Sequence, residues 1–219
     1  MTDFALARRN MVDGQLRPNR VTNAELLTAI GDLPRERFLP EALRSVAYAD
    51  DDVPLGGGRY LMEPMVLARL IQTLQPQHRD RALILGAGHG YGAALLARLV
   101  KLVTAVESDP ALAGAGEQIA KDMGLVNIHW VTGKLEQGAP DSAPYDVVLI
   151  EGAVRQIPQT ILDQMAEGGR LAAIVTGAPG AMGVAQIFIK DGGITSGRPL
   201  FEAGTPLLPG FAPPPRFTF

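Results

Sequence analysis

Short apolar runs alternate with helical spacing through the middle and end of the chain. Five apolar runs of strand length predict buried parallel strands: 82–85, 102–106, 126–131, 147–150 and 170–175. The spacing of apolar residues between these runs predicts helices over 91–100, 110–123 and 157–165. Two further runs, 184–189 and 194–201, flank Asp191-Gly192-Gly193, a turn that suits a hairpin. This order predicts an α/β fold with a doubly wound, mostly parallel seven-stranded sheet.

The first third of the chain lacks this alternation. Helical spacing predicts helices over 4–16, 24–33 and 65–74, and a short helix between prolines over 34–43. An acidic connector, Tyr48–Asp52, and a non-helical glycine loop, Gly56–Met62, lie before the third long helix. We therefore expect an N-terminal helical cap.

Three segments divide the chain within one domain. Residues 1–78 are expected to form the cap with the glycine loop, residues 79–205 the α/β core, and residues 206–219 a tail rich in proline and phenylalanine. Aromatic side chains prefer burial, so Phe211, Phe217 and Phe219 favour a tail that runs as a strap over the surface.

A glycine turn after the first predicted core strand is the main chemical signal. Gly86, Gly88 and Gly90 lack Cβ atoms, so a ligand can approach the backbone closely there. Glu107 ends the next predicted strand, roughly 20 residues further on, where a carboxylate can reach ribose hydroxyls. The alternative is a turn that merely connects a strand to a helix, which the combined strand, turn, helix, strand and acid disfavour.

The spacing of the glycines narrows the ligand. A dinucleotide fingerprint has the form G-x-G-x-x-G, but Tyr91 occupies the position of its third glycine. The pattern present, G-A-G-H-G-Y-G, has the form G-x-G-x-G, which together with a downstream acid is typical of S-adenosylmethionine methyltransferases.

Composition excludes several other classes of function. The net charge of −3 gives no electrostatic case for binding nucleic acid or an anionic membrane. The chain has no cysteines, so disulfides, thiolate zinc sites and cysteine nucleophiles are excluded. His78 and His129 have no carboxylate at ligand spacing, and no metal site is predicted. No apolar stretch reaches the roughly 18 residues of a membrane span and no signal-peptide pattern is present, so a cytoplasmic location is expected.

Several short motifs, in order and spacing, carry a resemblance to a known family. They are Pro34-Arg35-Glu36-Arg37-Phe38-Leu39-Pro40, Ala47-Tyr48-Ala49-Asp50, Pro54-Leu55-Gly56-Gly57-Gly58, Gly86-Ala87-Gly88-His89-Gly90-Tyr91, Glu107, Pro144-Tyr145-Asp146 and Gly168-Gly169-Arg170-Leu171. From about Met11 to Ile189 the chain resembles protein-L-isoaspartate (D-aspartate) O-methyltransferases.

The resemblance implies a class I, Rossmann-like methyltransferase fold and a protein-repair activity. The expected reaction moves a methyl group from S-adenosylmethionine to the carboxylate of an isoaspartyl residue in a protein or peptide, or to another small carboxylate acceptor. S-adenosylhomocysteine is the expected product, with no metal, and the protein is expected as a monomer or homodimer. A carboxylate is already a nucleophile at neutral pH, so catalysis is expected to depend on positioning.

The resemblance also implies a cofactor site. Glu107 is expected to bind the ribose, the glycine turn to bracket the methionine portion, and residues 133–135 to flank the adenine. The full expected set is Gly86, Ala87, Gly88, His89, Gly90, Glu107, Ser108, Gly133, Lys134, Leu135 and Glu151.

The chain departs from the family pattern at the acceptor loop and beside the adenine. The loop residues Gln-Thr-Ile-Ser of the family are Arg59-Tyr60-Leu61-Met62 here, the family G-D-G turn is Gly133-Lys134-Leu135, and a family acid aligns with Ile84. No residue is assigned a catalytic role, and Arg59, Tyr60 and Met62 mark the acceptor loop.

Two interpretations of that loop stay open. Arg59 and Tyr60 either form a new donor set for a substrate carboxylate or only pack the loop. The alternative function is a catalytically inactive descendant of the family that binds the cofactor or a protein partner. A nicotinamide-binding oxidoreductase would need the G-x-G-x-x-G that the chain lacks.

Overall fold

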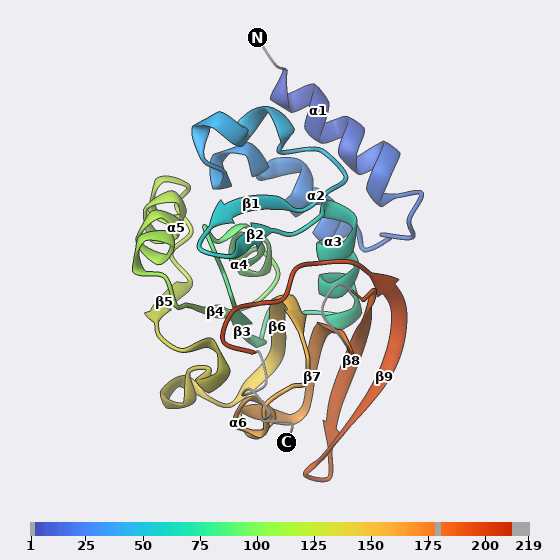
Figure 1. Cartoon of the computed structure of the whole chain (residues 1–219), viewed down its shortest axis with the longest axis vertical. Coiled ribbons are helices and arrows are strands. Elements are labelled where there is room, and N and C mark those ends of the chain that lie inside the picture. Colours follow the sequence, from blue (N-terminus) through green and yellow to red (C-terminus); the bar gives the residue numbers. More distant parts are fainter. Residues whose placement is uncertain (1–2, 178–180, 212–219) are drawn as a thin grey trace, which may run out of the picture.

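A seven-stranded sheet organises the chain in the computed structural model, which describes residues 3–177 and 181–211 (Figure 1). The strand order is β5-β4-β3-β6-β7-β8-β9. The first five of these strands run parallel, and the β8–β9 hairpin adds an antiparallel end. The bounds are β3 (Arg81–Leu85), β4 (Leu102–Glu107), β5 (Ile128–Thr132), β6 (Tyr145–Val154), β7 (Met165–Val175), β8 (Gly183–Asp191) and β9 (Ile194–Ala203). The predicted seven-stranded, doubly wound sheet is confirmed.

Helices cover both faces of this sheet, and the helices of the N-terminal third lie together in space. The blue N-terminal helices of Figure 1 lie together at one end of the molecule, with the small β1–β2 hairpin beside them. The α-helices are α1 (Phe4–Met11), α2 (Ala24–Asp32), α3 (Pro64–Leu74), α4 (Tyr91–Ala97), α5 (Pro110–Asp122) and α6 (Gln159–Asp163). Shorter helical turns are η1 (Val12–Leu16), η2 (Arg35–Phe38), η3 (Glu41–Val46), η4 (Leu135–Gln137) and η5 (Pro140–Ser142). None of the helices within residues 3–177 and 181–211 is long and apolar enough to cross a membrane.

Alternate residues of the central strands serve two separate hydrophobic cores. Ala82 and Ile84 of β3 belong to the larger core, which includes side chains of α3, α4 and the N-terminal helices. Leu83 and Leu85 point to the opposite face and join a smaller core. Because β3 is buried on both faces, its apolar run is continuous, as expected for a central parallel strand.

Two segments differ from their predicted form. The glycine loop is a hairpin of β1 (Val53–Gly56) and β2 (Arg59–Leu61), which form their own two-stranded sheet. Strand β6 continues to Val154, beyond its predicted end at 150, because Ala153 and Val154 pair with β7 after a bulge. Glu151 therefore lies within the strand. Of the three tail phenylalanines, Phe211 is buried, while Phe217 and Phe219 lie outside the described residues.

Two glycines of α5 allow a matched test of packing. A Cβ atom on Gly116 would lie 2.9 Å from Trp130 Cζ2 and 3.0 Å from the His89 carbonyl oxygen, whereas one on Gly114 would meet nothing within 4 Å. We expect Gly116→Ala to lower the free energy of unfolding by about 1–3 kcal/mol through overpacking. Gly114→Ala should raise it by about 0.5–1 kcal/mol, because alanine favours the helix. Urea denaturation measures both, and equal effects would contradict this packing.

Candidate functional site

The glycine turn joins the end of β3 to the start of α4. Gly86 and Ala87 both donate backbone hydrogen bonds to the Val106 carbonyl, at 3.0 and 3.3 Å, which ties the turn to β4. Gly86, Gly88 and Gly90 have φ angles of 78°, 54° and 89°, in the left-handed region that favours glycine. The three glycines of the sequence pattern therefore shape a turn that residues with a Cβ atom would strain.

Glu107 is fixed by backbone donors at the end of β4. Its side chain is fully buried. Oε2 accepts a hydrogen bond from the Gly88 amide at 2.9 Å, and Oε1 accepts from the amides of Ser108 at 2.7 Å and Asp109 at 3.0 Å. The carboxylate thus lies directly beside the glycine turn, as the sequence pattern predicts for a ribose-binding acid.

The side chain of Arg59, from β2, donates hydrogen bonds to this carboxylate. Its Nε donates to both Glu107 oxygens, at 3.1 and 3.2 Å, and its Nη2 donates to Ser108 Oγ at 2.7 Å. The Arg59 side chain is only 3% exposed. The guanidinium therefore faces the predicted ribose position and forms a buried ion pair there.

The segment that follows β9 lies against β6 at the same end of the sheet as Glu107. The amide of Ala153 donates to the Pro206 carbonyl at 3.0 Å, and the amide of Leu208 donates to the Ala153 carbonyl at 2.8 Å. In Figure 1 this dark red segment crosses towards β3 below β2. We call residues 205–208 the C-terminal crossing segment.

Two leucines contact the glycine turn. The Cβ position of Gly86 lies 2.7 Å from Leu208 Cδ1, and that of Gly88 lies 2.7 Å from Leu55 Cδ1. Leu208 comes from the C-terminal crossing segment and Leu55 from β1. Side chains of the chain itself therefore fill the space over the turn.

The remaining predicted site residues lie around this centre. His89 Nδ1 is 2.9 Å from the Phe38 carbonyl oxygen, so its ring contacts η2. Leu135 is buried in the same core as Leu208, whereas Lys134 is exposed. Gly133 donates a backbone hydrogen bond to the Glu107 carbonyl at 3.0 Å. The structure thus brings residues 133–135 to the same end of the sheet as Glu107, and their role with the adenine stays a prediction.

The acceptor loop is held by a buried arginine that the sequence did not single out. Arg35 is fully buried; its Nη2 donates to the Met62 carbonyl at 2.6 Å, and its Nε donates to the Ala47 carbonyl at 2.7 Å. Its guanidinium carbon also lies 4.9 Å from the centre of the Tyr91 ring. Met62 is buried, whereas Tyr60 is 38% exposed. The only sequence signal for Arg35 was its place in the PRE-F motif.

Glu151 places a second carboxylate beside the first turn of α4. It lies against Gly92 in the first turn of α4, where a Cβ atom would overlap its carboxylate. Within the described part of the chain its Oε1 is buried without a hydrogen-bond partner. Burial raises the pKa of Glu151 to about 8; the positive charge of Arg35 opposes this shift and the negative charge of Glu107 adds to it.

Glu151 makes stability depend on pH in a predictable direction. Its pKa is raised from 4.5 to about 8 on folding, so between these values the folded protein holds a proton that the unfolded chain releases. The contribution of the protonated carboxyl to the free energy of unfolding is fully present below pH 4.5 and is lost as the pH rises through about 8. At about pH 8.5 we expect Glu151→Gln to be more stable than the unmodified chain by at least about 1.4 kcal/mol, the equivalent of one pKa unit. Urea denaturation of both at about pH 5 and pH 8.5 tests this, and parallel pH profiles would contradict it.

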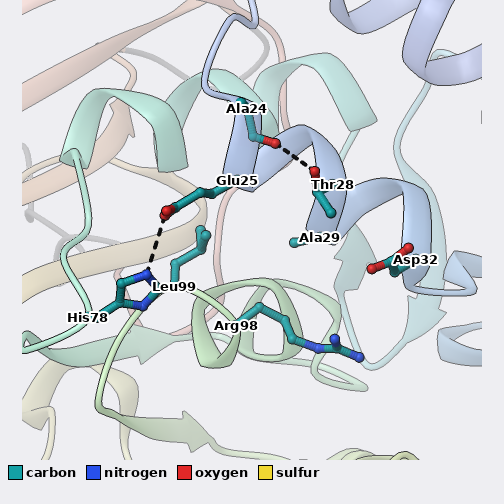
Figure 2. A pocket seen from close by; sticks show the side chains of 8 residues that line it. All are labelled: Ala24, Glu25, Thr28, Ala29, Asp32, His78, Arg98 and Leu99. Carbon is teal, nitrogen blue, oxygen red and sulfur yellow. Dashed lines mark hydrogen bonds and ion pairs between the residues drawn. The ribbon is translucent and has the colours of Figure 1, made fainter.

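A separate hollow lies between α2 and the end of α4 (Figure 2). Its volume is about 370 Å³, and its lining comes from α2, His78 and the end of α4. His78 Nε2 lies 3.6 Å from Glu25 Oε2 across it, and both side chains are exposed. No predicted site residue lines this hollow. Across residues 3–177 and 181–211, no group of three His, Asp or Glu side chains could hold a metal ion.

The residues at the carboxyl ends of the strands are of the types that an S-adenosylmethionine site requires, but the space for the ligand is filled. The glycine turn and the buried acid stand where the cofactor pattern requires them. In the described conformation, however, Arg59 occupies Glu107, and Leu55 and Leu208 cover the turn. The sequence missed both leucines, because nothing in a glycine- or proline-rich loop indicates which distant turn its apolar residue will contact.

Comparison with known proteins identifies the relatives of the chain. A model of the protein-L-isoaspartate(D-aspartate) O-methyltransferase family matches residues 7–197. The protein-L-isoaspartate O-methyltransferase of Herpetosiphon aurantiacus is 40% identical over 166 residues, which cover 76% of this chain and 74% of the relative. That of Koribacter versatilis is 36% identical over 179 residues, covering 82% and 80%.

Solved structures show the same fold. A protein-L-isoaspartate O-methyltransferase superposes with a TM-score of 0.81 at 24% identity, covering 93% of this chain and 67% of that one. A Plasmodium falciparum protein solved with S-adenosyl-L-homocysteine gives 0.77 at 18% identity, covering 93% and 98%. At these identities the structural matches establish the fold, and the sequence matches establish the family. The chain belongs to the protein-L-isoaspartate(D-aspartate) O-methyltransferase family.

Proposed function

We propose that the chain is an S-adenosylmethionine-dependent methyltransferase that acts on the carboxylate of isoaspartyl residues in proteins or peptides. The observation that carries this proposal is family membership over residues 7–197, combined with a glycine turn whose Gly88 amide binds the buried carboxylate at the end of β4. The relatives named above carry the same activity in their names.

Residue roles follow from position at the strand ends. Glu107 would hold the ribose hydroxyls, the glycine turn would border the methionine portion, and residues 133–135 would flank the adenine. Tyr60 is the exposed hydroxyl of the acceptor loop and the side chain best placed to donate to an acceptor carboxylate. These roles require a conformation in which Arg59 has left Glu107.

The remaining expectations from the sequence belong to the same proposal. They are the division into a cap, a core and a tail at residues 1–78, 79–205 and 206–219, the cytoplasmic location, and the monomeric or homodimeric state. The absence of a nucleic-acid partner is proposed on the net charge of −3.

Methyl transfer to a defined peptide tests the function. We expect methyl groups from S-adenosylmethionine to be incorporated into a peptide with one isoaspartyl residue and not into the same peptide with a normal aspartyl residue. Base-labile radiolabelled ester is the readout, because an ester of a carboxylate hydrolyses in alkali. Incorporation into neither peptide by a protein that binds S-adenosylhomocysteine would point to another acceptor. Failure to bind the product as well would favour an inactive descendant that binds a protein partner and not the cofactor.

A further inference from the structure

We propose that the chain closes its own cofactor cleft: Arg59 locks the β1–β2 hairpin onto Glu107, the C-terminal crossing segment covers the glycine turn, and S-adenosylmethionine binds only after both have moved. This inference rests on the proposed function, since it describes how the same site is regulated.

Arg59 and a ribose would compete for one carboxylate. Glu107 accepts hydrogen bonds from three backbone amides, from Ser108 Oγ at 3.4 Å and from Arg59 Nε, and these donors use the roughly four acceptor positions of a carboxylate. Because the side chain is fully buried, no other group can reach it while Arg59 is in place. Release of Arg59 is therefore a condition for the ribose contact.

The space that the cofactor would need is filled by side chains. The cavity that borders Met62, Glu151 and Leu208 measures about 10 Å³. Small-molecule sites measure about 300–1,000 Å³. Leu208 and Leu55, whose methyl groups lie over Gly86 and Gly88, must therefore withdraw before a ligand can approach the turn.

The β1–β2 hairpin and the C-terminal crossing segment are both attached in a way that permits movement. In the described part of the chain β1 and β2 pair only with each other, so the hairpin can move without breaking a ladder of the seven-stranded sheet, although Val53 and Leu61 pack into the larger core. Gly56 at the end of β1 and the turn residues Gly57 and Gly58 all have positive φ angles. Two backbone hydrogen bonds through Ala153 hold the C-terminal crossing segment to β6.

The closed arrangement leaves two buried polar atoms without hydrogen-bond partners. Among the described residues, Arg59 Nη1 and Glu151 Oε1 are buried without hydrogen-bond partners. A buried polar atom without a partner destabilises the state that contains it. The closed arrangement thus carries a cost that opening removes, which limits how far the closed conformation is favoured.

Binding of S-adenosylhomocysteine to variants of the full chain tests the latch. Arg59→Gln removes the charge that holds the hairpin, while three backbone amides still satisfy Glu107. Leu208→Ala removes methyl groups from the turn and keeps the backbone hydrogen bonds of residue 208. Arg17→Gln is the matched control, because Arg17 is an exposed arginine paired only with Asp13 in the described structure. Titration calorimetry gives the dissociation constants.

We expect Arg59→Gln to bind S-adenosylhomocysteine at least about 10-fold more tightly than the unmodified chain, since the apparent affinity scales with the fraction of open protein. Leu208→Ala should also bind more tightly, and Arg17→Gln should match the unmodified chain. Hydrogen exchange of peptides covering residues 53–61 and 203–211 should be faster in Arg59→Gln.

The outcomes separate the latch from the proposed function. Equal affinity in all four proteins would overturn the latch and leave the cofactor assignment in place. Failure of all four to bind, with faster exchange in Arg59→Gln, would overturn the assigned cofactor and support the latch as a structural contact. Failure to bind with unchanged exchange would overturn both.

Discussion

Replacing Glu107 by glutamine lowers the free energy of unfolding by about 3–5 kcal/mol, because it leaves the buried guanidinium of Arg59 without a counter-charge. The amide also fits poorly among its neighbours. The Glu107 carboxylate accepts from the backbone amides of Gly88, Ser108 and Asp109, and the NH₂ group of glutamine would face at least one of these donors. Urea denaturation gives the difference.

The reverse substitution provides the control. Arg59→Gln leaves the Glu107 carboxylate with its three backbone donors, so we expect it to cost about 1–2 kcal/mol, the scale of one or two net hydrogen bonds. The two variants break the same ion pair, so their difference isolates the charge that remains buried. Equal losses in both would contradict this asymmetry.

Replacing Arg35 by alanine should have the second large effect, a loss of about 3–5 kcal/mol. The substitution removes a fully buried side chain and leaves the carbonyl oxygens of Ala47 and Met62 without their donor, and hydrogen bonds from charged groups contribute about 1.5–3 kcal/mol each. The stacking of the guanidinium on Tyr91 is lost as well. Thermal and urea denaturation measure the loss.

Arg37 is the matched control for Arg35 in the same helical turn. Its Nη2 lies 3.5 Å from Asp122 Oδ2, and its side chain is 44% exposed. Exposed ion pairs contribute about 0–1 kcal/mol, so Arg37→Ala should change stability little. A similar loss in both variants would mean that η2 as a whole, rather than the buried guanidinium, holds the acceptor loop.

The pattern of the sequence predicted the fold well because its signals are local. The apolar runs of β3 and β4, the glycine turn and Glu107 all lie within one stretch of chain, and the parallel arrangement brings their ends together. The hairpin at Asp191-Gly192-Gly193 followed from its turn residues in the same way.

The contacts of Arg59 and Leu208 at the carboxyl ends of the strands join distant residues, which local patterns do not encode. Arg59 meets Glu107 across 48 positions, and Leu208 meets the turn at Gly86 from the far end of the chain. In the sequence, Arg59 is a departure from the family pattern that allows two interpretations, a donor to the acceptor and a packing residue. The structure places its guanidinium on Glu107, the acid predicted to bind the ribose, a partner that neither interpretation named.

The Arg59–Glu107 pair also constrains how this lineage can change. A chain that carries Arg59 cannot lose the acid without leaving a buried charge unpaired, whereas a chain that carries the acid can gain or lose the arginine at smaller cost. The arginine is therefore the partner expected to arise second and to disappear first. While it is present, folding alone is enough to retain Glu107 through mutation, independently of selection for methyl transfer.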